Sequence, residues 1–462
     1  MNLFGLQLKT HFICEMIPLP LEFEQRIIDQ YSDGKMLLET LVSLNGPVSV
    51  RIHPLKKNEL ITKNRVPWSS SGYYLDKRPV FTLDPFFHAG GYYPQEAGSM
   101  LIEVALKEMD LPENPIGLDM CASPGGKSTL ITDFLNRKGL LVANEIIRSR
   151  ALVLRENLSK WGYENCMVSN NAPEKIGQLT NTFDFVLIDA PCSGEGMFRK
   201  DENARSEWSS ANAKMCVGRQ RNILENAIEC LKEDGYLIYS TCTFNPEENE
   251  HNIQWLIDEM DMEYCSLPIE KSWNLYSPKN NLGYSCLPNH TESEGFYIAL
   301  LRKKTKTNSS NRENKLKSLE KAALIPEVIS SLFSEDIKVY FHQGFYYAFP
   351  KEHVDLGKFL LKELNVMKWG VRVGEMINNK FIPDHELALS FLLSENSFPK
   401  VNLEKQEALN YLKGNSFSVN APIGWCIITY ENVPLGWIKN LGNRTNNYYP
   451  KEYRIRMDIS NA

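Results

Sequence analysis

The sequence predicts an α/β protein with a doubly wound, parallel central sheet, a small α+β domain before it and a β-rich region after it. Between residues 115 and 302, apolar strand-like runs alternate with helical stretches. This alternation is typical of a parallel sheet covered by helices on both faces. Helical spacing precedes this region, and short aromatic strand-like runs follow it. With 462 residues, the chain is long enough for about two to four such domains.

The composition limits the classes of function. Hydrophobic residues make up 43% of the chain and charged residues 23%, which is usual for a soluble globular protein. No apolar run approaches the roughly 18 residues of a membrane span, and the first residues lack the pattern of a signal peptide. The ten cysteines are scattered without paired spacing, so we expect no disulfide framework, no metal site and a reducing cytoplasm. The net charge of -6 disfavours a general nucleic-acid binder, although basic residues can still gather locally.

The N-terminal part is predicted to hold one small domain. Residues 1–15 carry no convincing element and are expected to be an extension or a disordered start. Residues 16–107 are expected to form an α+β domain that can bind RNA. Apolar residues at helical spacing run from Phe23 to Leu44, and residues 48–54 alternate as a half-buried strand does.

The central domain, residues 108–302, brings several polar side chains to the ends of strands. The expected strands are 116–121, 140–144, 183–188, 235–239 and 295–301. Glu145, Asp189 and Cys242 follow three of them. Since open α/β sheets bind ligands at the carboxyl ends of their strands, we expect these side chains to share one ligand site.

A glycine turn after the first of these strands points to the kind of ligand. Gly125 and Gly126 let the backbone approach a ligand closely where a strand leads into a helix. A phosphate loop would need glycine at Cys121, and the dinucleotide fingerprint is absent. With Glu145 placed to bind ribose hydroxyls, a nucleoside-type ligand remains, and S-adenosylmethionine fits this layout. The aromatic and glycine loop at 88–96 is equally consistent with a mobile connection and with a wall of the cleft.

Two cysteines follow strands in this sheet. Cys242 precedes Asn245 and Pro246, a pattern typical of a helix start, and the N-terminal end of a helix favours a thiolate. Cys192 lies in a second corner after Asp189. Carbon 5 of cytosine becomes nucleophilic enough to take a methyl group once a thiolate has added to carbon 6, while an acid such as Asp189 stabilises the charge at nitrogen 3. Because one thiol is sufficient for addition, the second suggests a separate role in release.

Three long motifs resemble those of a known family. They are 119–127, 189–201 and 240–244, and they are similar to the Sun-type RNA cytosine-carbon-5 methyltransferases, most of all the RsmF-like branch that modifies small-subunit ribosomal RNA. The resemblance implies a Rossmann-like methyltransferase domain with Cys242 as nucleophile, Cys192 assisting release, and Asp189 at the base and the cofactor. Around S-adenosylmethionine it implies Cys121, Ala122, Ser123, Pro124, Gly125, Gly126, Lys127, Glu145 and Asp189. The family often holds adenine with an Asp after the third strand; residues 168–173 offer none, so Asn171 is the candidate there.

The C-terminal part is expected to contact RNA. Residues 303–324 form a basic linker, either a solvated spacer or an RNA contact, and 325–396 a small α+β domain that begins with a hairpin. The resemblance implies a PUA-like RNA-binding domain at 397–462. Basic residues interleaved with aromatics can serve phosphates and stacked bases, although the surface of any small barrel would look similar. The candidate RNA-binding residues are Lys439, Arg444, Lys451 and Arg454.

The predicted function is therefore methylation of carbon 5 of a cytosine in 16S ribosomal RNA by a cytoplasmic monomer, with transfer RNA as the alternative substrate. A DNA cytosine methyltransferase would instead use Pro191 and Cys192 for attack and would leave Cys242 without a role. A third reading is a non-catalytic RNA-binding assembly factor. All the motif residues that the chemistry needs are present, which disfavours that reading.

Overall fold

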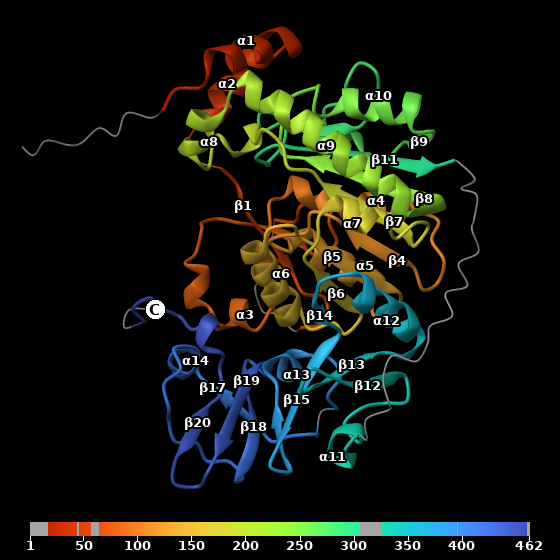
Figure 1. The fold of residues 1–462 in the computed structure, drawn as a ribbon. Helices are drawn as coiled ribbons and strands as arrows, with labels where there is room; N and C mark the ends of the chain where they lie inside the picture. Colours follow the sequence, from red (N-terminus) through yellow and green to blue (C-terminus); the bar gives the residue numbers. More distant parts are fainter. Residues whose placement is uncertain (1–16, 44–45, 57–63, 305–324, 395, 460–462) are drawn as a thin grey trace, which may run out of the picture.

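The computed structural model describes residues 17–43, 46–56, 64–304, 325–394 and 396–459. The predicted start at 1–15, and the linker beyond residue 304, lie outside these ranges. The N-terminal helices and two small C-terminal sheets lie at opposite ends of a large central sheet (Figure 1). Within the described ranges, no helix is long and apolar enough to cross a membrane.

The central sheet has nine strands in the order β10-β11-β8-β7-β4-β5-β6-β14, with β9 paired to β11. Their bounds are β4 (Ile116–Asp119), β5 (Leu140–Asn144), β6 (Cys166–Ser169), β7 (Phe183–Asp189), β8 (Leu231–Thr241), β9 (Met262–Cys265), β10 (Tyr284–Cys286), β11 (Phe296–Lys303) and β14 (Val366–Trp369). The five strands from β6 to β8 are parallel, as predicted. Both edges are antiparallel, so the sheet is mixed rather than wholly parallel.

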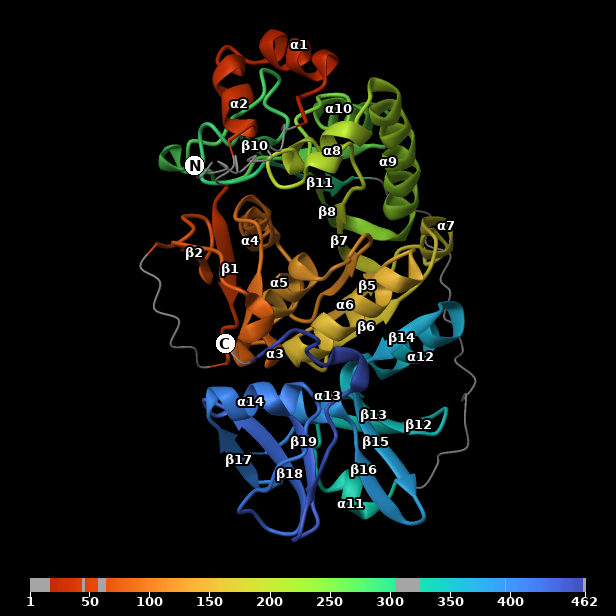
Figure 2. The same cartoon turned by 90° about the vertical axis from the view of Figure 1, so that its left-hand side faces the viewer.

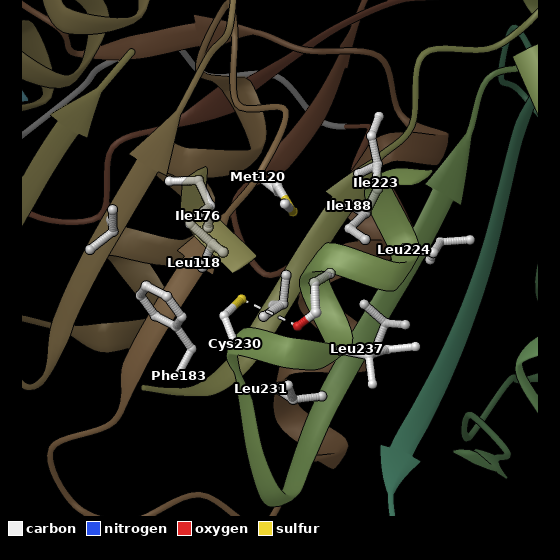
Figure 3. Packing of buried hydrophobic residues seen from close by; sticks show 14 of the residues in the cluster. Leu118, Met120, Ile176, Phe183, Ile188, Ile223, Leu224, Cys230, Leu231 and Leu237 are labelled. Carbon is white, nitrogen blue, oxygen red and sulfur yellow. Dashed lines mark hydrogen bonds between the residues drawn. The ribbon is translucent and has the colours of Figure 1, made fainter. Parts of the chain in front are cut away.

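Helices cover both faces of this sheet because its strands are apolar on both sides. One face packs against α4 (Ile102–Glu108), α5 (Gly126–Leu135) and α6 (Arg148–Trp161), and the other against α7 (Pro173–Gly177), α9 (Ser210–Cys230), α10 (Glu250–Glu259) and α12 (Val354–Glu363). Figure 3 shows Leu118 and Phe183 of the sheet in one cluster of buried side chains with Ile176 of α7 and Leu224 of α9. The Cys230 thiol there donates to the Ala227 carbonyl at 3.2 Å and serves packing alone.

The N-terminal part combines two helices with a three-stranded sheet of order β2-β1-β3. The elements are α1 (Leu21–Gln30), α2 (Gly34–Leu41), β1 (Val48–Ile52), β2 (Gly72–Leu75), η1 (Phe81–Leu83), α3 (Pro85–His88), β3 (Tyr92–Pro94) and η2 (Gly98–Leu101). β1 is not the half-buried strand that its alternation predicts, since Arg51 is fully buried. Its guanidinium pairs with Asp133 and donates to Gln95 Oε1 at 2.9 Å, which satisfies the buried charge.

The C-terminal part holds two four-stranded sheets, β12-β13-β15-β16 and β17-β18-β19-β20. The strands are β12 (Ile337–His342), β13 (Phe345–Pro350), β15 (Val371–Ile377), β16 (Lys380–Pro383), β17 (Lys400–Leu403), β18 (Gly424–Tyr430), β19 (Val433–Asn440) and β20 (Thr445–Asn447). The helices are α11 (Glu327–Ser330), η5 (Lys351–His353), α13 (His385–Leu389), α14 (Lys405–Leu412) and η6 (Lys451–Tyr453). In Figure 2 the last sheet and α14 lie below α3 and β1, and the two parts share one hydrophobic core.

One strand crosses the domain boundary that the sequence suggests. β14 lies within residues 325–396, which were expected to form a domain of their own, yet it pairs antiparallel with β6. The structure thus draws this segment into the central sheet. The pairing joins Val366 to Ser169, which are distant in sequence, and no local pattern signals such a contact.

Candidate active site

The cleft lies where the loops after β4, β7 and β8 meet the loop after β3. It encloses about 430 Å³. Its lining includes Tyr93, Pro94, Gln95, Glu96, Ser99, Asp119, Cys121, Ala122, Ser123, Pro124, Gly126, Lys127, Asp189, Gly196, Met197, Lys200, Cys242, Glu294, Gly295 and Phe296. Of the two readings of the loop at 88–96, the structure therefore supports a wall of the cleft.

The glycine turn forms one wall as predicted. Gly125 has φ +115°, a left-handed conformation that disfavours any side chain, and α5 begins at Gly126. A Cβ placed on Gly126 would come within 3.1 Å of the Tyr93 ring, so the space at this turn depends on glycine. The side-chain amide of Asn157 donates to the Pro124 carbonyl at 2.8 Å and holds the turn from α6.

Asp119 ends β4 inside this wall and is fully buried. Its Oδ2 accepts from the Ser128 hydroxyl at 2.7 Å, while its Oδ1 has no hydrogen-bond partner. Burial raises the pKa of this carboxyl to about 7. An unpartnered, buried acceptor that faces a cavity fits a ligand with a donor, such as the ammonium group of S-adenosylmethionine. Asp119 was not among the predicted site residues, although it ends β4 just as Asp189 ends β7.

Lys127 and Asp189 form an ion pair in the lining of the cleft. Lys127 Nζ lies 2.8 Å from Asp189 Oδ2, and the Ser240 hydroxyl donates to Asp189 Oδ1 at 2.9 Å. Burial lowers the pKa of the Lys127 ammonium, but the attraction of Asp189 outweighs it, so the pKa is raised overall. This pair therefore holds a proton next to the thiols.

The structure brings the two predicted thiols together. The sulfur atoms of Cys192 and Cys242 lie 3.2 Å apart, and Cys242 lines the cavity. The hydrogen bond to Cys242 and then burial raise the pKa of Cys192 well above its ordinary value, so Cys192 stays protonated. Burial also raises the pKa of Cys121, which makes that thiol a poor nucleophile.

The loop that carries Cys242 is held by hydrogen bonds rather than by a helix end. The predicted helix start at Asn245 is wrong, because residues 246–249 form a turn and α10 begins at Glu250. The Gly196 amide donates to the Cys242 carbonyl at 2.8 Å. The hydroxyls of Ser193 and Thr243 lie 2.7 Å apart and join the two thiol loops.

Two buried carboxylates near the thiols, those of Glu248 and Glu195, were not predicted as site residues from the sequence. Glu248 accepts from the Ser193 amide and from the Gln220 side chain, each at 2.9 Å. Glu195 accepts from the Phe244 amide at 3.0 Å. Both are fully buried. The only signal in the sequence was the position of Glu195 inside the motif at 189–201 and of Glu248 shortly after the motif at 240–244, where acidic residues also occur as exposed loop residues.

Glu145 and Asn171 lie outside the lining of the cavity. The Glu145 side chain is buried, its Oε1 accepts from the Ile147 amide at 2.9 Å, and its Oε2 is 3.6 Å from Arg150. Ile146 and Ile147 beside it are 58% and 48% exposed, an apolar surface next to an acid. Asn171 Oδ1 accepts from the Asn365 amide at 3.1 Å, and its buried Nδ2 has no partner. Glu145, predicted to bind ribose, follows β5, and Asn171, predicted to bind adenine, follows β6. Both are therefore separate from the part of the cleft that holds the two thiols.

The four basic candidates of the C-terminal part differ in exposure. Arg444 and Lys451 are exposed, whereas Lys439 and Arg454 are half-buried. Lys439 Nζ lies 5.1 Å from the centre of the Trp425 ring, a cation–π contact. Arg444, in the loop between β19 and β20, and Lys451, in η6, are therefore the two candidates that the surface exposes.

Solved structures share this fold. A methyltransferase homolog protein from Pyrococcus horikoshii is 30% identical, with a TM-score of 0.53 over 61% of this chain and 94% of that chain. A structure of NSun6 from Pyrococcus horikoshii with SFG has a TM-score of 0.54 and 20% identity, over 63% of this chain and all (100%) of that one. The Rossmann-like sheet and its cleft define an S-adenosylmethionine-dependent methyltransferase.

Family models and relatives narrow this class. The model described as 16S rRNA methyltransferase RsmB/F matches residues 107–302, the N-terminal domain of 16S rRNA methyltransferase RsmF matches 19–97, and the methyltransferase RsmF PUA domain matches 398–455. Ribosomal RNA small subunit methyltransferase F of Shewanella piezotolerans is 30% identical over 442 residues, 87% of this chain and 90% of the relative. The protein of the same name from Vibrio vulnificus is 30% identical over 413 residues, 85% of each. The chain belongs to the ribosomal RNA small subunit methyltransferase F family, and the predicted family and PUA-like region are confirmed.

Proposed function

We propose that this chain methylates carbon 5 of a cytosine in 16S ribosomal RNA. The observation that carries this proposal is the pair of thiols 3.2 Å apart, with the Lys127–Asp189 pair beside them in one cleft. A second thiol in contact with the first is placed to assist the release of a cysteine adduct. The named relatives, which act on ribosomal RNA of the small subunit, support the substrate.

The residues of the glycine turn suit the cofactor. The unpartnered Asp119 Oδ1 would accept from the ammonium group, and the turn from Cys121 to Lys127 would surround the methionine part. Glu145 would hold the ribose, with Ile146 as an apolar face for the adenine and Asn171 as a donor to it. When bound, S-adenosylmethionine supplies an electrophilic methyl group.

The thiols would act in turn on a base flipped out of its stack. Cys242 Sγ would form a bond to carbon 6, and nitrogen 3 would take a proton from the Lys127–Asp189 pair as negative charge develops on the ring. After carbon 5 is methylated, the proton on nitrogen 3 would return to the Lys127–Asp189 pair and the proton on carbon 5 would pass to water. The electrons of that carbon–hydrogen bond would form the double bond between carbons 5 and 6, and the electrons of the bond between sulfur and carbon 6 would leave with sulfur. The protonated Cys192 thiol can then donate to the departing Cys242 sulfur, which it already contacts.

RNA contact would extend from this cleft to the C-terminal sheet. Arg444 and Lys451 are the exposed cations there and would bind phosphates. The reaction needs free thiols, and the nine described cysteines are all free, so we propose the reducing cytoplasm as its location. Transfer RNA remains the second candidate substrate, because PUA-like domains and cysteine chemistry do not depend on the kind of RNA.

The test is a map of 5-methylcytosine in a strain that lacks the protein. One position in 16S ribosomal RNA should lose the modification, regain it with the wild-type gene and with the remote control Cys265→Ala, and stay unmodified with Cys242→Ala. Ribosomal and transfer RNA should be sequenced side by side. If 5-methylcytosine disappears from a position in transfer RNA alone, transfer RNA is the substrate instead. If it disappears from neither kind of RNA, the proposal is refuted.

A further inference from the structure

Glu195 joins helix α1 to the loop that carries Cys242. Its side chain is fully buried. Its Oε1 contacts Arg26 Nη2 at 2.5 Å and accepts from the Trp208 indole at 3.0 Å, while its Oε2 accepts from the Phe244 amide at 3.0 Å. The carboxylate therefore connects the N-terminal part directly to a residue two positions after the proposed nucleophile.

The carbonyl of Phe244 is bound from the same helix. Arg26 Nη1 donates to it at 3.3 Å, and the Gln30 side-chain amide donates to it at 2.9 Å. Arg26 also donates to Gln30 Oε1 at 2.9 Å, which fixes the two side chains relative to each other. Both polar groups of the Phe244 backbone are thus held by Glu195 and α1.

Packing and a second backbone contact extend this link to Cys242. The buried Phe244 ring belongs to a core formed with Phe23 and Ile27 of α1. Gly196, the neighbour of Glu195, donates its amide to the Cys242 carbonyl at 2.8 Å. A Cβ on Gly196 would lie 2.9 Å from that oxygen, so the approach requires glycine.

We propose that Arg26 of α1, acting through Glu195 and Phe244, is a positioning residue for Cys242. It lies outside the lining of the cleft and acts by fixing the backbone from which the thiol projects. Helix α1 is then part of the catalytic apparatus. This inference rests on the proposed role of Cys242. It makes the distinct claim that α1 controls where that thiol lies.

Arg26→Ala in the full-length chain is the test, with Arg137→Ala as its matched control. Arg137 also pairs with a buried glutamate, Glu164 at 2.7 Å, and neither residue lines the cleft. We expect kcat to fall on the order of 10–100-fold in Arg26→Ala, as small displacements of catalytic groups do, with KM for S-adenosylmethionine unchanged. Added guanidinium should restore part of the rate, because the Arg26 side chain is 24% exposed and leaves an accessible site. Arg137→Ala should match the wild type in all of these measurements.

A second readout does not depend on the RNA reaction. The rate at which iodoacetamide modifies Cys242, followed by mass spectrometry, should change in Arg26→Ala and return with guanidinium, while modification of the remote Cys265 stays constant. Gln30→Ala is a milder variant should Arg26→Ala unfold, and it should shift the same rates in the same direction. Unchanged kcat and unchanged Cys242 labelling in either folded variant would overturn the inference. Altered labelling in a protein whose wild type methylates no RNA would preserve the inference about position and reject the proposed function.

Discussion

The two ends of the cleft are built in opposite ways. At the thiol end, the carbonyls of Cys242, Thr243 and Phe244 all accept hydrogen bonds from other parts of the chain. At the glycine turn, Asp119 Oδ1 is buried without a partner. The loop that carries the reacting thiol is therefore held by hydrogen bonds within the protein, whereas the acceptor that would bind the ligand has no partner within it. Preorganised reacting groups need no rearrangement during the reaction, whereas an open acceptor gains its partner from the ligand.

The largest expected effect lies at the thiol end. Cys242→Ala should lower the rate of methyl transfer on the order of 10⁴-fold or more, as removal of a covalent nucleophile does in other enzymes, and should leave no covalent protein–RNA species. Cys192→Ala should still form the adduct but stall at release. The stalled species would appear as a slowly migrating band on a denaturing gel.

The same pair of variants separates the RNA enzyme from a DNA-type enzyme. Covalent trapping by Cys242→Ala, with none by Cys192→Ala, would exchange the roles of the thiols. Cys265→Ala, a partly exposed cysteine outside the cleft, should behave as the wild type in both assays.

At the glycine turn, the largest effect should come from Asp119→Asn. At about pH 8, above the pKa of about 7 that burial gives this carboxyl, the variant replaces a charged acceptor by a neutral one, and a lost charged hydrogen bond costs about 1.5–3 kcal/mol, or roughly 10–150-fold in affinity. Calorimetry with S-adenosylmethionine would measure it. Unchanged affinity would mean that Asp119 does not bind the cofactor. The two ends of the cleft would then not differ in the way described above.

Glu145→Ala should weaken the cofactor less than Asp119→Asn. The Glu145 carboxylate is already engaged by the Ile147 amide and lies near Arg150, so less of it is free for a ribose. We expect a loss of about 1.5 kcal/mol, the low end of the range for a charged hydrogen bond, by the same calorimetry. A larger loss than in Asp119→Asn would place the main anchor of the cofactor at β5 instead.

The unpartnered Asp119 carboxyl should also affect how the free energy of unfolding depends on pH. Burial raises the pKa of Asp119 from 3.8 to about 7, so between these values the folded protein keeps a proton that the unfolded chain has lost. The free energy of unfolding contributed by this group therefore falls as the pH rises from about 4 to about 7. Asp119→Asn should remove that part of the decline, measured by urea unfolding at about pH 5 and about pH 8. Equal declines in the variant and the wild type would contradict the assignment.

The smallest effect is expected outside both ends. Replacing exposed Arg444 and Lys451 by alanine should reduce the slope of RNA affinity against salt concentration by about one for each lost phosphate contact, and should leave cofactor affinity unchanged. Replacing half-buried Lys439 should change the slope less, because its ammonium already lies over Trp425. Filter binding over a salt series measures both, and an unchanged slope in the double variant would remove these residues from the RNA site.

The sequence predicted the reacting groups better than their supports. Cys192, Cys242 and Asp189 follow strands whose apolar runs are plain, and parallel strands bring their ends together. Glu195 was missed because a glutamate between two glycines in a loop looks solvated, and only the fold buries it against α1. The helix start expected at Asn245 was wrong although Asn245 Oδ1 accepts from the Glu247 amide at 3.1 Å, as an N-cap does, because the backbone leaves the helical conformation at Asn249 (φ -110°, ψ -97°) and α10 begins only at Glu250.

The position of β14 has a consequence for synthesis of the protein. A nascent chain that has emerged only as far as residue 304 has every parallel strand of the central sheet, but the outer edge of β6 is still without the partner that β14 supplies. An open edge strand is a template for pairing with other chains, so this interval is when the protein is most exposed to misassembly. Expression of residues 1–304 alone would prolong that interval indefinitely. Removal of the last sheet after residue 396 would leave the edge closed.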